Sequence, residues 1–253
     1  MDLANKVAII TGSSSGVGAQ TAIKLARFGV KVVINYAHSE QGALDTCNEV
    51  LTQGGHGVIC KADISNEQQC ISLVDKTIET FGQLDILINN AGTTKFIAHK
   101  DLNLLTNDIW QKTLATNLMG PFYMSRAATP YLVRQGGGEI VMTSSIAGLT
   151  AHGSSIAYCA SKAGVNSLTK TLANALGKDN IRVNAICPGL IDGEWARSGW
   201  QESWQAAKDY TLSHSAIKRI STPSDVADSI IAVLLGSDNM TGQIISLDSG
   251  LTL

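Results

Sequence analysis

Tyr158 and Lys162 stand four residues apart in the segment YCASK, inside a stretch, 154–177, whose pattern predicts a helix. Four residues make about one helical turn, so both side chains lie on the same face. A cation beside a phenol favours the phenolate and lowers its pKa from the usual value of about 10. We therefore expect this pair to exchange a proton near neutral pH, as a general acid–base catalyst does, although such a pair taken alone is also a common surface contact.

A glycine-rich turn, TGSSSGVG (11–18), separates a predicted strand at 7–10 from a predicted helix at 18–29. Its glycines allow a sharp turn and a close approach of a ligand to the backbone, and the helix directs free N–H groups and its positive dipole end at the turn. This arrangement predicts a site for the pyrophosphate of a dinucleotide, the alternative being an ordinary loop. The residues predicted to contact it are Gly12, Ser14, Ser15, Gly16, Val17 and Gly18.

The second predicted strand, 31–35, indicates which dinucleotide is bound. An acid at its end would bond the adenosine ribose and repel a 2′-phosphate, but none occurs before Glu40. Tyr36, His38 and Ser39 can instead donate hydrogen bonds to a phosphate. We predict NADP(H) as the cofactor, with NAD(H) as the alternative because no arginine stands there.

Short β-branched runs alternate with helical patterns along the whole chain, which predicts right-handed βαβ crossovers and a parallel sheet covered on both faces. Residues 1–253 are expected to form a single α/β domain with a doubly wound sheet. One long excursion, about 190–220, interrupts the alternation and carries Trp195, Trp200 and Trp204. We expect it to be a substrate lid, with Trp200 and Trp204 sharing one helical face. The predicted strands are 7–10, 31–35, 57–63, 84–89, 139–144, 182–187 and 243–248.

Composition excludes several classes of function. The formal net charge is −2, so binding to nucleic acid or to an anionic membrane surface is not expected. No apolar run approaches the roughly 20 residues of a membrane span, and no signal peptide precedes the first strand. The five cysteines form no CxxC pair, which predicts neither disulfides nor a metal site and fits a reducing, cytoplasmic location.

Taken together, these motifs resemble those of the classical short-chain dehydrogenase/reductase family, and most closely its 3-oxoacyl-[acyl-carrier-protein] reductase-like members. The resemblance spans essentially the whole chain and implies a Rossmann-type fold. The motifs appear in the family's order as TGSSSGVG (11–18), AD (62–63), NNAG (89–92), TN (116–117), SS (144–145), YCASK (158–162) and PG (188–189).

The resemblance assigns a role to each matching position. It implies a catalytic group of Asn117, Ser145, Tyr158 and Lys162, with Tyr158 and Lys162 also contacting the cofactor. Tyr158 would protonate the alkoxide formed when the nicotinamide gives hydride to a carbonyl, Ser145 would stabilise the same oxygen, Lys162 would hold the ribose, and Asn117 would anchor a proton-returning water chain. Further cofactor contacts are implied for Asp63 and Ile64 near the adenine, Asn90, Ala91 and Gly92 near the ribose, and Pro188, Gly189 and Ile191 near the nicotinamide.

Two positions depart from the family's pattern. Gly193 stands where a threonine is common, which removes a bond to the nicotinamide carboxamide and frees the hinge of the lid. Ser249 replaces a glycine of the usual DGG and must adopt whatever backbone geometry the glycine served.

The sequence thus predicts an NADP(H)-dependent reductase of a ketone or 3-oxoacyl carbonyl, acting on a small-molecule carbonyl or the corresponding alcohol. An NAD-dependent dehydrogenase of a sugar, polyol or hydroxysteroid remains open, and so does a dinucleotide-binding regulator without turnover. The resemblance also implies a homotetramer that pairs through the helices expected near 107–134 and 154–177.

Overall fold

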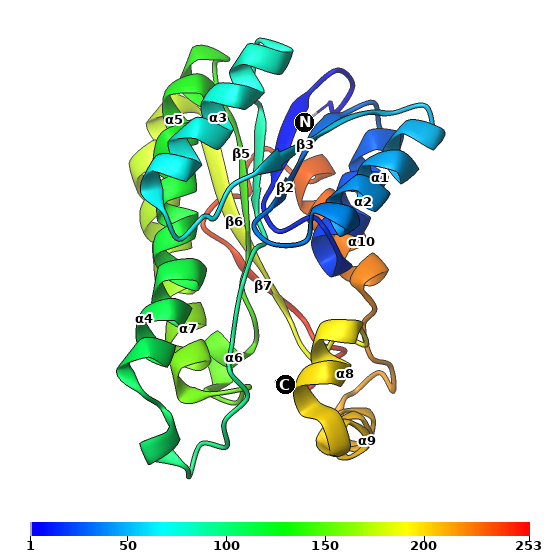
Figure 1. The fold of residues 1–253 in the computed structure, drawn as a ribbon, viewed down its shortest axis with the longest axis vertical. Coiled ribbons are helices and arrows are strands. Elements are labelled where there is room, and N and C mark those ends of the chain that lie inside the picture. Colours follow the sequence, from blue (N-terminus) through cyan, green and yellow to red (C-terminus); the bar gives the residue numbers. More distant parts are fainter. Residues whose placement is uncertain (1) are drawn as a thin grey trace.

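The computed structural model describes residues 2–253 and is built on one seven-stranded parallel sheet (Figure 1). The strand order is β3-β2-β1-β4-β5-β6-β7, and every neighbouring pair is parallel. This confirms the predicted parallel sheet, and each predicted strand overlaps an observed one. The strands are β1 (Val7–Ile10), β2 (Lys31–Tyr36), β3 (His56–Lys61), β4 (Ile86–Asn89), β5 (Gly138–Thr143), β6 (Ile181–Pro188) and β7 (Ile244–Leu247).

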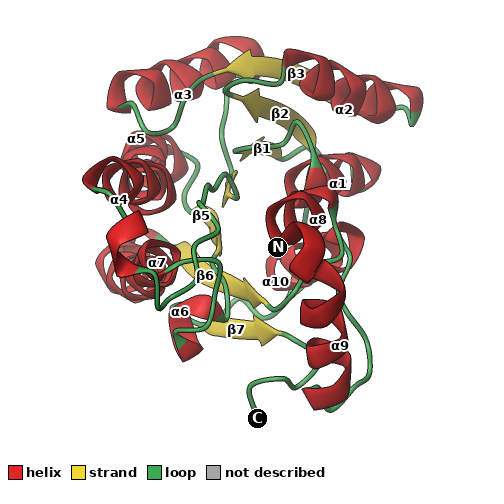
Figure 2. Cartoon of the chain, turned by 60° about the horizontal axis from the view of Figure 1, so that its bottom comes forward, coloured by secondary structure: helices red, strands yellow, loops and turns green. Residues whose placement is uncertain are grey.

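Helices cover both faces of the sheet, as expected for a doubly wound fold. Helices α1, α2 and α10 lie on one side, and α3, α4, α5 and α7 lie on the other (Figures 1 and 2). The helices are α1 (Gly16–Arg27), α2 (Glu40–Thr52), α3 (Glu67–Phe81), α4 (Asn107–Leu114), α5 (Gly120–Arg134), α6 (Ala147–Thr150), α7 (Ile156–Leu176), α8 (Glu194–Trp200), α9 (Trp204–His214) and α10 (Pro223–Leu235).

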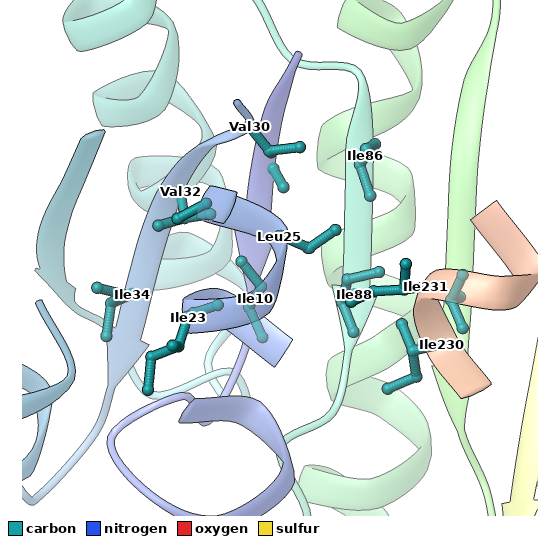
Figure 3. Packing of buried hydrophobic residues seen from close by; sticks show 14 of the residues in the cluster. Ile10, Ile23, Leu25, Val30, Val32, Ile34, Ile86, Ile88, Ile230 and Ile231 are labelled. Carbon is teal, nitrogen blue, oxygen red and sulfur yellow. The ribbon is translucent and has the colours of Figure 1, made fainter. Parts of the chain in front are cut away.

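The protein has two hydrophobic clusters, one on each face of the sheet, and each strand contributes alternate side chains to both. Ile10, Ile34 and Ile88 pack beneath α1 and α10 (Figure 3). Their immediate neighbours Ile9 and Leu87 belong to the other cluster, beneath α3, α5 and α7. Successive strand residues point to opposite faces, so unbroken Val/Ile runs are what a sheet buried on both sides requires.

The sheet order reverses between β1 and β4. From β1 the chain proceeds outward through β2 and β3, and then returns to β4 on the other side of β1 before continuing to β7. The loops that leave β1 and β4 diverge to opposite faces, so a crevice opens at the carboxyl ends of these strands. The glycine-rich turn and the NNAG segment both lie at this point.

Two expectations about helices are corrected. The segment 107–134 is not one regular helix, because a π-helical turn, Ala115–Met119, separates α4 from α5 and contains Asn117. Trp200 and Trp204 do not share one helix, because Trp200 ends α8 and Trp204 begins α9. Gln201, with a φ of 47°, breaks the helical path between them.

Glu139 and Arg182 form a buried ion pair across β5 and β6. Their atoms Oε1 and Nη2 lie 2.6 Å apart, and Arg182 also donates to the carbonyls of Ser237 and Met240. Burial nevertheless raises the pKa of Glu139 to about 7, against the lowering influence of Arg182. The cost of desolvating the carboxylate is thus only partly offset.

We expect the Glu139→Gln variant to lose a pH dependence of stability that the wild type shows. The folded chain keeps a proton on Glu139 that the unfolded chain releases above about pH 4.5, so the free energy of unfolding falls as pH rises from there to about 7. Urea denaturation at several pH values measures this slope. The exposed Glu79→Gln is the matched control, and an unchanged slope in Glu139→Gln would contradict the assignment.

Within residues 2–253, none of the helices combines the length and the apolar composition that a membrane crossing demands.

Candidate active site

A single large cavity of about 1950 Å³ runs along the carboxyl ends of the strands and collects most of the predicted site residues. It extends from the glycine-rich turn to helices α8 and α9, in the segment predicted to be a lid. The predicted residues that line it are Gly12, Ser14, Ser15, Gly16, Val17, His38, Ser39, Asp63, Ile64, Asn90, Ala91, Gly92, Ser145, Tyr158, Lys162, Pro188, Gly189 and Ile191.

Two asparagines hold the glycine-rich turn in place. The backbone N–H of Gly12, whose φ is 63°, donates to Oδ1 of Asn35 at 3.1 Å. The side-chain amide of Asn90 donates to the carbonyls of Thr11 and Gly12 at 3.0 and 3.1 Å. Asn90 therefore braces the turn from behind, and Asn35 is a supporting residue that the sequence motifs did not single out.

The turn fits a dinucleotide pyrophosphate. The N-cap of α1, Ser15, makes no side-chain hydrogen bond to the helix, so the first N–H groups of α1 are not capped by it. Gly12 is also close to the NNAG segment, because a methyl group there would lie 2.8 Å from Cα of Ala91. A bare helix N-terminus beside a glycine backbone is the chemistry that a phosphate group selects.

Three predicted residues do not line the cavity. Gly18 faces the turn itself, and Asn117 lies behind the catalytic group. Tyr36 is buried in the core cluster beneath α1, and its hydroxyl bonds Glu40. The strand alternation explains this, because Asn35 is the neighbour that turns toward the cavity while Tyr36 turns away.

Helix α7 positions Tyr158 and Lys162, the pair predicted to be catalytic. Its N-cap, Ser155, accepts a hydrogen bond from the backbone N–H of Tyr158 at 3.2 Å and so fixes the first turn. Ser145 follows β5 and hydrogen-bonds the Tyr158 hydroxyl. The structure therefore brings Ser145 and Tyr158 together at the cavity, from two segments thirteen positions apart in the sequence.

Lys162 lies over the Tyr158 ring. Its Nζ lies 5.6 Å from the ring centroid and donates to the carbonyl of Thr143 at 2.7 Å. Burial raises the pKa of Tyr158 to about 12, and the hydrogen bond with Ser145 offsets only part of that rise. Burial also lowers the pKa of Lys162 to about 8. The expectation that Lys162 lowers the pKa of Tyr158 is therefore wrong, because desolvation dominates.

Asn117 is held by the loop that follows β4. Its Oδ1 accepts from the backbone N–H of Thr93 at 2.7 Å, and its Nδ2 donates to the Thr93 carbonyl and to Ser161 Oγ. The π-helical turn makes this placement possible, since it rotates the following residues relative to a regular helix, and such turns occur frequently at functional sites. Asn117 and Lys162 both approach Gly92.

Asn166 is a supporting residue that the motifs did not reveal. Its Oδ1 accepts from Ser144 Oγ at 2.7 Å and its Nδ2 donates to the Gly148 carbonyl at 3.3 Å, so it ties the end of β5 and helix α6 to α7. The available signal was its spacing, four residues after Lys162 and eight after Tyr158, which places a polar residue on the catalytic face of the helix.

The two departures from the family pattern have different structural outcomes. Gly193 is the N-cap of α8 and provides no side-chain cap, and a methyl group there would lie 3.3 Å from Pro223 Cγ. Ser249 adopts a φ of 58°, in the left-handed region that glycine tolerates at no steric cost.

The Ser249→Gly variant should therefore be more stable by about 0.5–1 kcal/mol, because relief of left-handed strain exceeds the entropy cost of glycine. The matched control is Ser246→Gly in β7, where the backbone is extended and glycine should destabilise. Thermal and urea unfolding of the two variants would decide this. Equal loss of stability in both would show that Ser249 is not strained.

Comparisons with known proteins agree with this geometry. A family model described as enoyl-(acyl carrier protein) reductase matches residues 12–252. L-rhamnose 1-dehydrogenase (NAD(P)(+)) of Sphingomonas sp. (strain SKA58) is 36% identical over 98% of this chain and 97% of that protein. A 3-oxoacyl-[acyl-carrier-protein] reductase of Synechocystis sp. is 32% identical over 99% of this chain and 98% of that protein.

Among solved structures, one described as a short-chain dehydrogenase/reductase from Burkholderia xenovorans superposes with a TM-score of 0.89, at 33% identity and 97% coverage of both chains. The chain belongs to the short-chain dehydrogenase/reductase family of oxidoreductases. Members of this family use NAD(P)(H), and the residues along the cavity fit such a dinucleotide.

The arrangement is suited to proton transfer beside a hydride transfer. A bound nicotinamide would supply or accept the hydride. Tyr158 holds a proton that it can give to an oxygen bearing developing negative charge, and Ser145 can donate a second hydrogen bond to that oxygen. Lys162 packs against the phenol ring, with its Nζ 5.6 Å from the ring centroid and bonded to the Thr143 carbonyl.

Proposed function

We propose that the protein uses NADPH to reduce the carbonyl of a ketone or 3-oxoacyl compound to a secondary alcohol. The observation that carries this proposal is the position of the hydrogen-bonded Ser145–Tyr158 pair on the wall of the same cavity that begins at the glycine-rich turn. A carbonyl placed against the pair would lie within the space that continues from the dinucleotide.

The direction of the reaction is supported by the state of Tyr158. With a pKa of about 12, the phenol keeps its proton at neutral pH and can act as the acid that reduction needs. Alcohol oxidation requires the phenolate instead, so it is disfavoured at neutral pH and becomes easier as pH rises.

NADP(H) is proposed because no acid lines the cavity at the end of β2. The lining there consists of Asn35, Ala37, His38 and Ser39, and Glu40 is bonded to the buried Tyr36 on the other side of the strand. The N-terminus of α2 adds backbone donors and a positive dipole end close to Ser39, which is its N-cap.

The Ala37→Asp variant tests this preference. The wild type should bind NADPH more tightly than NADH by about tenfold, roughly the contribution of one hydrogen bond to a charged group. An aspartate directly after β2 would repel the 2′-phosphate and bond the ribose, so the variant should prefer NADH. Titrations followed by nicotinamide fluorescence give the dissociation constants of NADPH and NADH for the wild type and for the variant. A wild-type preference for NADH would reject the NADP(H) proposal and leave the reductase proposal intact.

An NAD-dependent dehydrogenase is a second candidate. No lysine or arginine lines the cavity beside Ala37, His38 and Ser39, and a 2′-phosphate would lack a cationic partner. The similar L-rhamnose 1-dehydrogenase also carries both nicotinamide cofactors in its name. Oxidation of sugars, polyols or hydroxysteroids with NAD, without reduction of any ketone by NADPH, would favour this candidate.

The homotetramer remains part of the proposal. Helix α5 presents Phe122 and Tyr123 with Arg126 stacked over both rings, a surface that a second copy could cover. Sedimentation equilibrium would give the subunit number. A cytoplasmic location is proposed from the five free cysteines.

A further inference from the structure

The part of the cavity beyond Tyr158 has an aromatic wall, which we define as Phe96, Trp195 and Trp200. Phe96 lies 5.7 Å from Trp195 and 5.5 Å from Trp200 between ring centroids, in tilted and edge-to-face arrangements. Trp195 in turn lies 6.3 Å from the catalytic ring of Tyr158. The wall therefore continues directly from the catalytic group toward the lid.

The wall is fixed from both sides. A methyl group on Gly199 would lie 2.0 Å from Cε2 and 2.2 Å from Cζ of Phe96, so one edge of the Phe96 ring packs against the backbone of α8. The loop that carries Phe96 is joined to the segment before α7, because the backbone N–H of Ile97 donates to the Ser154 carbonyl at 2.8 Å. Asp192 and Arg197 form an ion pair at the start of α8. A wall held this way is a preorganised surface.

Trp195 has an open face despite these contacts. Its exposed fraction is 54%, and it lines the cavity. A large exposed aromatic ring in a concave site is typical of a contact with an apolar ligand. Trp195 therefore offers exposed aromatic surface next to the ring of Tyr158, whose centroid lies 6.3 Å away.

The charges around this end of the cavity argue against an anionic substrate. The acidic and histidine side chains lining it near the lid are His152, Glu194 and His214. No arginine is found among the cavity's lining residues within 2–253. Of the two lysines that line it, Lys112 belongs to α4, and Lys162 lies against the Tyr158 ring with its Nζ bonded to the Thr143 carbonyl. A carboxylate or a phosphate held near Trp195 would therefore meet Glu194 of the same helix, and the ammonium group of Lys162 is already bonded to a backbone carbonyl.

We infer that the substrate is an uncharged ketone with a ring next to its carbonyl, and that Trp195 determines this specificity by stacking on the ring. This inference rests on the proposed function and narrows its substrate class. Aromatic and apolar rings gain both buried area and a defined orientation on an indole face. That orientation would present the carbonyl oxygen to Ser145 and Tyr158.

The test compares acetophenone and cyclohexanone with the open-chain 2-octanone and 2-hexanone, and adds the anion acetoacetate. For the wild type we expect kcat/KM to favour each ring ketone over its open-chain counterpart by about tenfold, with acetoacetate the poorest. Trp195→Ala should remove that preference and Trp195→Phe should largely restore it. Trp204→Ala is the matched control, because Trp204 belongs to the lid segment but does not line the cavity.

A binding measurement separates failure of this inference from failure of the proposed function. Calorimetry of 1-phenylethanol and 2-octanol with the wild type and Trp195→Ala needs no turnover. If the wild type binds the ring alcohol selectively and Trp195→Ala does not, the inference is supported even if no ketone is reduced. Three results would overturn the inference. The first is equal binding of both alcohols by the wild type, and the second is a preference for acetoacetate among the ketones. The third is a Trp195→Ala variant that differs from the wild type only in its subunit number, measured by sedimentation.

Discussion

Replacement of Tyr158 by phenylalanine should lower kcat by about 10²–10⁴-fold, the usual contribution of a positioned general acid. The hydroxyl of Tyr158 carries the transferable proton, and its pKa of about 12 keeps that proton in place at neutral pH. Phenylalanine fills the same space beside Trp195 and leaves the turn of α7 capped by Ser155, so cofactor binding should stay within about twofold.

Stopped-flow absorbance of the nicotinamide gives kcat, and fluorescence titration gives the dissociation constant of the cofactor. Tyr131→Phe is the matched control, since the hydroxyl of Tyr131, on α5, bonds Asp75 of α3 and Tyr131 does not line the cavity. A Tyr158→Phe protein with normal turnover would remove Tyr158 from the mechanism. A variant that no longer binds cofactor would show a structural role instead.

The rates of oxidation and reduction should depend differently on pH. Oxidation of the alcohol needs the phenolate, whose fraction rises about tenfold per pH unit below the pKa, so the oxidation rate should climb from about pH 6 to 9. Reduction uses the phenol and should change little over the same range. Parallel profiles in the two directions would contradict the assignment of the proton to Tyr158.

The second large effect is expected for Gly18→Ala. A methyl group at Gly18 would lie 2.5 Å from the Gly12 carbonyl oxygen, 2.7 Å from Asn90 Nδ2 and 2.8 Å from Ser13 Cα. Two of these atoms belong to the backbone of the turn and cannot move without displacing it. We therefore expect α1 to separate from the turn, which removes the helix N-terminus from the pyrophosphate and weakens dinucleotide binding by about 100-fold.

Cofactor titration of Gly18→Ala measures this loss, and circular dichroism confirms that the variant is folded. Gly177→Ala is the control, because no atom outside its own helix neighbourhood lies within 4 Å of the added methyl group. Its φ of −59° also suits alanine. Normal affinity in Gly18→Ala would mean that the turn does not hold the cofactor.

Much of this architecture could be predicted from local sequence patterns. The strands could be predicted because both faces of the sheet are buried, so apolar residues, mostly Val and Ile, run without interruption through segments such as 7–10 and 32–34. Tyr158 and Lys162 could be predicted to share one helical face because helical spacing is a local property. Ser145 was assigned by the family resemblance, and the structure places it beside Tyr158.

The properties that were missed depend on tertiary contacts. The pKa of Tyr158 rises because distant segments enclose the ring, and the spacing to Lys162 carries no information about that enclosure. Phe96 lies about a hundred residues before its partner Trp195 and belongs to no motif. The turn at Gln201 was missed because the residue adopts a positive φ without being glycine, asparagine or aspartate.

The position of β1 in the sheet also governs how the chain must assemble as it leaves the ribosome. The partners of β1 are β2, which follows soon, and β4, which arrives only after residue 85 has been made. Until then one edge of β1 offers unpaired backbone groups, which favour association with other chains. The halves on either side of β1 and β4 each hold part of the cavity, because the glycine-rich turn lies in the first half and Tyr158 in the second. A nascent or truncated chain that ends before β4 should therefore be inactive and prone to aggregate, and the chain gains solubility and a complete site in the same late steps of folding.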